Sequence, residues 1–328
     1  MTARSGLPVT PASPRPHRTG VLVVRLCVAL AVLLTACSMP ASASRAALTT
    51  PPTTIATARA VAQLGTTTTT RTLTLDGLSR SYLVVVPAGR HGRLPLLMVL
   101  HGRGVTPAQE ELRTGFVPLA QEGKAVLVYP AGYGESWNAV GCCGEAQQFN
   151  VDDTAFLAAV VADATSHLPV DPSRVYLAGY SNGARMAFTE VCAHPTLFTA
   201  FATFGAVPTQ TCQDTSVPVP ALISAGAADP ELATTSPPRT TTQVIDSTVA
   251  LWRERDGCTA TAESRTIKPA QLTRWSDCRA GTAVESVLYD GVTHYWPSAN
   301  QVDIPFNITV GPSAAAATLM WSFLSAQH

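Results

Sequence analysis

The chain has 328 residues, of which 46% are hydrophobic and only 13% are charged, so it can bury a large core and intrinsic disorder is excluded for most of its length. Lysine plus arginine and aspartate plus glutamate number 22 each, which leaves no net formal charge. No basic run of the kind that follows a phosphate backbone is present, so we expect no nucleic-acid partner.

Residues 1–36 are predicted to form a signal peptide. A short cationic region ending at Arg18 precedes an apolar run over 26–36, which is shorter than the roughly 17–25 residues of a membrane span. The run ends in Leu34-Thr-Ala-Cys37, which resembles the bacterial lipobox, so we expect Cys37 to carry lipid. The protein would then be exported and anchored by lipid on the outer face of the cell membrane. The alternative interpretation is a plain secreted protein.

Residues 37–70 are rich in Ala, Ser, Thr and Pro and are predicted to be a tether, followed by one domain over 71–328. The domain opens with two predicted strands, 73–76 and 81–86, joined at an Asp-Gly hairpin signal. These two strands would form an antiparallel edge of the sheet.

Short apolar runs without alternation follow, and such strands belong to the middle of a covered, largely parallel sheet. They lie at 94–100, 125–129, 175–178, 201–204 and 221–224, and a further strand is predicted at 284–289. Stretches of helical length and composition lie between and after them, at 151–168, 184–193, 242–255 and 313–326. This alternation predicts an α/β fold with a mostly parallel central sheet and helices on both of its faces.

Of the eight cysteines, Cys27 leaves with the leader and Cys37 would carry lipid. An even number remains, which in an exported protein indicates disulfides rather than a metal site. The remaining cysteines are Cys142, Cys143, Cys192, Cys212, Cys258 and Cys278. No Cys-x-x-Cys or His-Glu-x-x-His motif is present, and we expect no metal.

We pair Cys258 with Cys278, because they bracket a polar segment, 259–277, that has little else to hold it. Closing a loop of this size would stabilise the fold by roughly 3 kcal/mol. A bond between the neighbouring residues Cys142 and Cys143 would be strained, so we expect each of them to reach a distant partner among the other two cysteines.

The sequence Gly179-Tyr-Ser-Asn-Gly183 matches the Gly-x-Ser-x-Gly motif and lies between a predicted strand and a predicted helix. A sharp strand-to-helix turn exposes the serine hydroxyl above the sheet, and the flanking glycines allow the backbone to crowd there. Ser181 is therefore the candidate nucleophile. The alternative is a glycine-rich turn without chemical consequence.

Hydrolases with this turn place the acid and then the base after the nucleophile, each in a loop that follows a later strand. Asp229 and His294 satisfy this order behind Ser181. His294 would take the serine proton, and Asp229 would orient the imidazole ring. Asp246 and Glu231 are the rival acids, and Asp246 lies inside a predicted helix.

The oxyanion of such a reaction needs two backbone N–H donors. The first would be that of Asn182, directly after the nucleophile. The second lies in the loop after strand 94–100, where we choose Arg103, with Gly104 as the alternative. We expect His101 in the same loop to be structural rather than a second base.

Seven short motifs occur in a fixed order and together resemble the polyhydroxybutyrate depolymerase and feruloyl esterase family of secreted α/β-hydrolases, including its actinobacterial lipoprotein members. They are Leu100-His-Gly-Arg-Gly, Ser136-Trp-Asn, Gly141-Cys-Cys-Gly, Val151-Asp-Asp, Gly179-Tyr-Ser-Asn-Gly, Ala228-Asp-Pro and His294-Tyr-Trp-Pro. The resemblance covers roughly 71–328. It implies an α/β-hydrolase fold and a serine esterase that needs no cofactor and acts on feruloyl or acetyl esters of plant-wall polysaccharides or on polyhydroxyalkanoate-type polyesters.

Trp137 and Trp296 lie near the predicted site and could wall an aromatic acyl group or a sugar ring; the alternative is ordinary loop packing. We expect Asp152 and Asp153 to start a helix rather than to act in catalysis. The partners would be an ester substrate and the membrane, and we expect a monomer. Other activities remain open because a fold does not determine chemistry: a peptidase, an acyltransferase, or a non-catalytic lipoprotein that binds wall glycans.

Overall fold

The computed structural model describes residues 65–89, 92–259 and 261–328. The predicted signal peptide, the lipidation site Cys37 and most of the predicted tether lie outside these residues. Within the described part of the chain, no helix is both long and apolar enough to cross a membrane.

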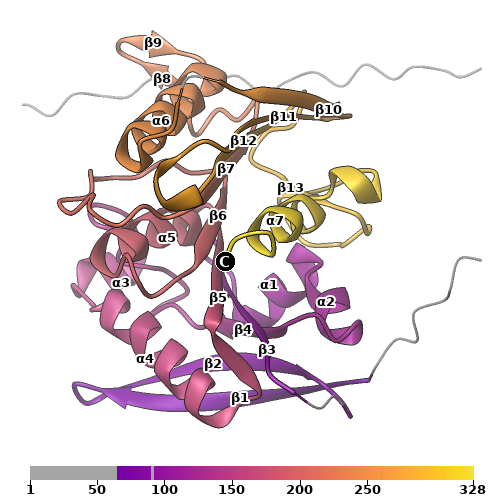
Figure 1. Cartoon of the computed structure of the whole chain (residues 1–328). Helices are drawn as coiled ribbons and strands as arrows, with labels where there is room; N and C mark the ends of the chain where they lie inside the picture. The colour runs from indigo at the N-terminus through magenta and orange to yellow at the C-terminus, as the bar shows by residue number, and fades with distance from the viewer. Residues whose placement is uncertain (1–64, 90–91, 260) are drawn as a thin grey trace, which may run out of the picture. The chain divides into compact units, whose positions relative to one another are not determined.

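A ten-stranded sheet runs through the domain (Figure 1). In spatial order its strands are β1 (Thr66–Leu75), β2 (Leu78–Pro87), β4 (Val126–Pro130), β3 (Leu94–Leu100), β5 (Val170–Tyr180), β6 (Ala200–Phe204), β7 (Ala221–Gly226), β12 (Val284–Tyr289), β11 (Ala270–Trp275) and β10 (Glu263–Ile267). The run from β4 to β12 is parallel, and the strands outside it are antiparallel at both edges.

Helices cover both faces of this sheet (Figure 1). One face carries α1 (Pro107–Thr114), α2 (Val117–Gln121) and α7 (Ala316–Leu324), and the other carries α3 (Gly144–Gln148), α4 (Asp153–His167), α5 (Asn182–Ala193) and α6 (Thr241–Asp256). Two short pairings, β8 (Thr234–Thr235) with β9 (Pro238–Arg239) and β13 (Trp296–Ser298) with β14 (Asn307–Thr309), lie outside the main sheet. Each face has its own hydrophobic core.

The central strands are buried along their whole length. Every residue of β3, β4, β6 and β7 is shielded from solvent. This is why their sequences are apolar without alternation: both faces of each strand lie under helices. The prediction of a covered, mostly parallel sheet with an antiparallel N-terminal edge is confirmed.

The boundary of the predicted tether at residue 70 is wrong. Strand β1 begins at Thr66, and its threonines pair in antiparallel register with the strand that follows, from Thr66 opposite Pro87 to Thr70 opposite Leu83. Threonine suits a strand because its branched Cβ fits the pleated backbone. These side chains are largely exposed on an edge strand, so the composition resembles that of a linker although the backbone is hydrogen-bonded.

The polar segment 259–277 also differs from the expectation that little holds it. It contains the β10–β11 hairpin, which adds two antiparallel strands to the sheet beyond β12. All but one of the residues of β10 are exposed, so the strand lacks the apolar alternation by which a half-buried strand is recognised. In β11, Ala270 and Leu272 are buried, which provides the packing.

The disulfides correct a third expectation. Cys258 is bonded to Cys278, at the base of the β10–β11 hairpin. Cys192, near the end of α5, is bonded to Cys212, and their Cα atoms lie 4.9 Å apart. Cys142 is bonded to its neighbour Cys143, so the prediction that each would reach a distant partner is wrong. The reason is tertiary: the two distant cysteines lie beside each other and are already paired.

Candidate active site

Ser181 lies at the turn between β5 and α5 in a backbone conformation that is unusual for an L-residue, with φ 53° and ψ −117°. Non-glycine residues with positive φ are strained and concentrate at functional sites. The flanking glycines make the turn possible. A Cβ at Gly179 would lie 2.5 Å from the carbonyl oxygen of Gly183, and a Cβ at Gly183 would collide with the carbonyl oxygen of Leu100. The predicted strand–turn–helix context of Ser181 is thus present.

A chain of hydrogen bonds joins Ser181 to His294 and Asp229. The Oγ of Ser181 lies 2.8 Å from Nε2 of His294, and Nδ1 of His294 lies 2.6 Å from Oδ2 of Asp229. Asp229 follows β7 and His294 follows β12, which are neighbours in the parallel part of the sheet. Because the carboxyl ends of parallel strands meet at one edge, residues far apart in sequence converge there.

Backbone contacts hold His294 in place. The hydroxyl of Tyr180 donates to the carbonyl oxygen of His294 at 2.9 Å. Gly205 has φ 74°, and a Cβ there would lie 3.0 Å from Cε1 of the imidazole. A Cβ at Gly226 would collide with the carbonyl oxygens of Val292 and Thr293. Glycines at these positions allow the loop that carries His294 to approach the sheet closely.

The rival acids occupy different places. Asp229 is buried, accepts the Nδ1–H of His294 and also accepts the backbone N–H of Glu231 at 2.9 Å. Glu231 is on the opposite side of the imidazole: its carboxylate is 3.7 Å from Nε2, and its side chain is 60% exposed. Asp246 lies within α6. Of the three, Asp229 is the carboxylate in position to orient the imidazole for proton transfer at Nε2.

The loop after β3 brings one backbone donor and one buried histidine to the site. The N–H of Gly104 donates to the carbonyl oxygen of Glu135 at 2.8 Å and is therefore occupied. The N–H of Arg103 meets no acceptor among the described residues, and the same holds for that of Asn182. Of the two sequence candidates in this loop, Arg103 therefore retains a free donor.

His101 has a structural environment. Its Nε2 accepts the N–H of Gly132 at 2.9 Å, and its Nδ1–H donates to the carbonyl oxygen of Gly102 at 2.8 Å. Burial lowers the pKa of His101 to about 4, so the ring is neutral near neutral pH. Both nitrogens are occupied, and neither is available as a base.

The expectation that Trp137 and Trp296 wall the substrate is wrong. Both rings are almost fully buried. The indole N–H of Trp137 donates to the carbonyl oxygen of His101 at 2.9 Å, and that of Trp296 donates to the carbonyl oxygen of Thr114 at 3.2 Å. Large aromatic rings with a satisfied N–H pack well in a core, and these two rings do so beneath the site rather than in it.

The side chain of Asn182 links the turn at Ser181 to the loop that contains Trp137. Its Oδ1 accepts the backbone N–H of Trp137 at 2.8 Å, and its Nδ2 donates to the carbonyl oxygen of the same residue at 3.1 Å. Asp153 fixes the same loop by accepting the N–H of Asn138 at 2.7 Å while it pairs with Arg80 at 2.7 Å. Asp152 caps α4 through the N–H of Ala155. These polar residues organise the structure around the site.

A pocket of about 250 Å³ lies over Ser181 and His294. Its other lining residues are Gly102, Arg103, Val105, Arg113, Cys142, Cys143, Tyr180, Asn182, Arg185, Gly205, Glu231, Leu232 and Phe306.

The sequence analysis identified neither Arg113 nor Arg185 as a site residue. Arg185 could have been found, because it lies one helical turn after Ser181 on α5. Arg113 comes from α1, and no local pattern connects it to the site. Within the described residues no cluster of three metal-ligating side chains occurs.

No family model matches the chain. Two curated proteins are similar to parts of it. "Putative esterase NocK" of Nocardia uniformis subsp. tsuyamanensis is 33% identical over 170 residues, which cover 50% of this chain and 49% of that protein. The bifunctional acetylxylan esterase/xylanase XynS20E of Neocallimastix patriciarum is 26% identical over 243 residues, which cover 70% of this chain and 33% of that protein. The chain thus spans about half or less of the length of these relatives.

Among solved structures, the acetyl xylan esterase from Aspergillus awamori is similar with a TM-score of 0.53 and 16% identity; the match covers 69% of this chain and 94% of that chain. At this identity the likeness concerns the fold alone. Together with the strand order and the turn at Ser181, it shows that the chain has the α/β-hydrolase fold.

Proposed function

We propose that the chain is a serine esterase that hydrolyses carboxylic esters through an acyl-enzyme intermediate, with Ser181 as nucleophile, His294 as general base and acid, and Asp229 as the orienting carboxylate. The observation that carries the proposal is the hydrogen-bonded chain from Ser181 through His294 to Asp229 at the edge of the sheet. The similarity of parts of the chain to esterases supports it.

In the first half of the reaction, Oγ of Ser181 attacks the ester carbonyl carbon while Nε2 of His294 takes the hydroxyl proton. The imidazolium that forms is stabilised by the adjacent carboxylate of Asp229. The tetrahedral intermediate collapses when its bond to the alcohol oxygen breaks. Nε2 then gives its proton to that oxygen, which leaves an acyl group on Ser181 and a free alcohol.

In the second half, a water molecule attacks the acyl carbon and His294 takes one of its protons. The bond to Oγ of Ser181 then breaks, the proton returns to Oγ and the carboxylic acid leaves. The oxyanion of each intermediate would accept hydrogen bonds from the backbone N–H groups of Asn182 and Arg103. The support for these two donors is that neither has an acceptor among the described residues.

The decisive experiment compares Ser181→Ala with wild type in the hydrolysis of p-nitrophenyl acetate and in labelling by a fluorophosphonate probe. Loss of the nucleophile should reduce turnover by about 10⁴-fold or more and abolish labelling. The thermal transition should stay near that of wild type. Ser166→Ala, which changes an exposed serine on α4, is the matched control and should retain both signals. Unchanged turnover in Ser181→Ala would end the esterase assignment, and an unlabelled wild type would favour a non-catalytic binding protein.

For the substrate, we propose feruloyl or acetyl esters of plant-wall polysaccharides or polyhydroxyalkanoate-type polyesters. The motif resemblance supports this class, and one of the partial relatives is an acetylxylan esterase/xylanase by name. Turnover of feruloyl, acetyl and hydroxybutyrate oligomer esters, each measured against the same Ser181→Ala blank, would rank them. A peptide substrate cleaved faster than all of them would favour the peptidase alternative.

We further propose export with lipid attachment at Cys37, as the leader sequence predicts. The disulfides agree with an oxidising compartment. A Cys37→Ser variant should lose labelling by a fatty-acid analogue and either appear in the medium or stay unprocessed. A wild-type protein without fatty-acid labelling would favour simple secretion.

A further inference from the structure

Four charged side chains besides those of the proposed triad line the pocket over Ser181: Arg103, Arg113, Arg185 and Glu231. Three of them are guanidiniums, which stay protonated at any physiological pH. The pocket therefore carries an excess of positive charge, although the chain as a whole has no net formal charge.

None of these three guanidiniums makes a hydrogen bond to another group among the described residues. The other two buried arginines of the described residues are each paired with a carboxylate: Arg80 lies 2.7 Å from Asp153, and Arg255 lies 2.6 Å from Asp256. Pairing is the usual condition of an arginine that is partly or wholly removed from water. The buried arginine of the pocket, Arg113, thus departs from the pattern of the other two buried arginines.

Arg113 is the most exceptional of the three, because its side chain is only 2% exposed. Its Nε and Nη1 atoms have no hydrogen-bond partner in the described part of the chain, and the guanidinium carbon lies 4.8 Å from the centre of the Tyr180 ring. Burying guanidinium N–H groups without acceptors is costly, and a ligand that enters the pocket could supply the missing acceptors.

The nearest carboxylate, that of Glu110, lies within ion-pair range of Arg113 but makes no hydrogen bond to it. An oxygen of Glu110 lies 3.7 Å from Nε, too far for a hydrogen bond. Burial raises the pKa of Glu110 to about 8, so this carboxyl is mostly protonated near neutral pH. Among the described residues, two N–H-bearing atoms of Arg113 thus lack an acceptor, which a group that enters the pocket can supply.

The positions of Arg103 and Arg185 indicate where a group that enters the pocket would lie relative to Ser181 and His294. Arg185 is one turn after Ser181 on α5, and Arg103 belongs to the loop whose backbone N–H is a proposed oxyanion donor. The single acidic side chain of the pocket, Glu231, is exposed and lies beside Nε2 of His294. An anion bound by the arginines would thus lie close to the ester that Ser181 attacks.

We propose that the Arg103, Arg113 and Arg185 side chains form a recognition site for a carboxylate on the substrate, so that the preferred esters are acidic ones with the carboxylate a few bonds from the scissile carbonyl. Guanidinium groups recognise carboxylates through two parallel N–H···O bonds, which supply orientation as well as affinity. The proposal rests on the proposed esterase function, because it concerns the substrate of the same site.

Two pairs of esters test the proposal, one for each side of the scissile bond. 4-Nitrophenyl monoglutarate, compared with neutral 4-nitrophenyl valerate, places a carboxylate on the acyl side. 3-Acetoxybenzoate, compared with its neutral methyl ester, places it on the alcohol side. After subtraction of spontaneous hydrolysis, kcat/KM of wild type should favour the acidic ester by about 10- to 100-fold in at least one pair, the range expected of a hydrogen bond between charged groups. The preference should shrink as salt is added.

Arg185→Gln and Arg103→Gln should each reduce this preference by about tenfold, with the change mainly in KM for the acidic ester. Both positions are at least partly exposed, so the variants should fold. Arg265→Gln removes an exposed arginine outside the pocket and is the matched control, which should keep the wild-type preference.

The outcomes separate the two proposals. If wild type hydrolyses the neutral esters through Ser181 but shows no preference in either pair, carboxylate recognition is overturned while the esterase assignment stands. Equal preference in wild type and both pocket variants would overturn it as well. If no ester is hydrolysed and no fluorophosphonate label appears, both proposals fail together.

Discussion

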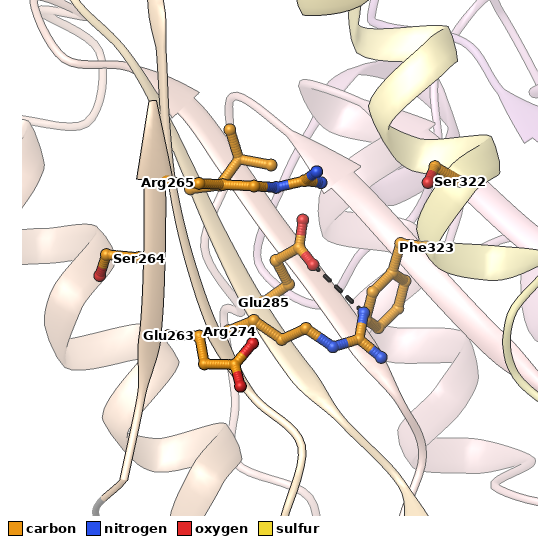
Figure 2. A pocket seen from close by; sticks show the side chains of 8 residues that line it. Glu263, Ser264, Arg265, Arg274, Glu285, Ser322 and Phe323 are labelled. Carbon is orange, nitrogen blue, oxygen red and sulfur yellow. Dashed lines mark hydrogen bonds and ion pairs between the residues drawn. The ribbon is translucent and has the colours of Figure 1, made fainter. Parts of the chain in front are cut away.

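Two hollows of similar size in the domain are lined by arginine and glutamate, and they differ in how those charges are paired. One is the pocket over Ser181. The other, of about 260 Å³, lies between the strands β10 to β12 and helix α7 (Figure 2). In this groove Arg274 points at Glu285 and lies 3.3 Å from it, and the guanidinium also lies 5.5 Å from the ring of Phe323.

The comparison shows that a hollow of a given volume and composition does not by itself indicate a ligand site. In the groove, the most buried acid, Glu285, has a guanidinium beside it. In the pocket, the most buried cation, Arg113, makes no side-chain hydrogen bond to any described residue, and it lines the same pocket as the nucleophile and its base. A buried guanidinium without a hydrogen bond, next to a reactive group, distinguishes the pocket, because buried charged groups are usually both paired and hydrogen-bonded.

The largest effect should come from Asp229→Asn. The amide would keep the shape of the carboxyl but favour the wrong tautomer of His294, so kcat should fall by about 10⁴-fold with little change in KM. Steady-state kinetics with p-nitrophenyl acetate measure this, and circular dichroism checks the fold. Asp246→Asn, which changes the rival carboxylate on α6, is the control and should keep wild-type kcat. The opposite result would move the acid to Asp246.

Removing the disulfide at the base of the β10–β11 hairpin should destabilise the region of the groove without changing any residue of the pocket over Ser181. Cys258→Ser combined with Cys278→Ser should lower the free energy of unfolding by up to about 3 kcal/mol, because the unfolded chain is no longer cross-linked. Chemical denaturation measures the loss. We expect kcat/KM to stay near wild type, and a parallel loss of activity would show that the two regions are coupled.

A pH-dependent effect is expected from the carboxyl behind Arg113. Between its ordinary pKa near 4.5 and the folded-state value of about 8, the unfolded chain has lost the Glu110 proton while the native state keeps it. Native stability should therefore fall as pH rises through this window, by roughly 1 kcal/mol per pH unit. Glu110→Gln removes the titrating group and should flatten this slope in thermal unfolding between about pH 6 and pH 8. An unchanged slope would mean that Glu110 is ionised in the native state.

The smallest effect should come from Arg274→Ala in the groove. Its ion pair with Glu285 is partly exposed to solvent, and pairs of this kind contribute about 1 kcal/mol or less to stability. Thermal unfolding should show a small decrease, and neither the acidic nor the neutral esters should change in kcat/KM. A large drop in ester turnover would assign the groove a part in the activity and would break the distinction between the two hollows.

The sequence determined the features that depend on neighbours along the chain. The turn at Ser181 could be predicted because its glycines, strand and helix are contiguous. The central strands could be predicted because burial on both faces leaves an uninterrupted apolar run. Asp229 and His294 could be named because each follows a predicted strand in the chain order that such hydrolases use, and the structure brings both into one hydrogen-bonded chain with Ser181.

Tertiary structure alone decided which side chains face the pocket and which cysteines meet. Trp137 and Trp296 are close to the site in sequence, yet the packing of the core covers both rings. Arg113 is far from Ser181 along the chain, yet α1 brings it to the pocket. The pairing of Cys142 with its neighbour followed from contacts made elsewhere, by the other cysteines. Such outcomes depend on distances between segments that no local pattern encodes, because burial and pairing are set by whichever side chains the whole fold brings together.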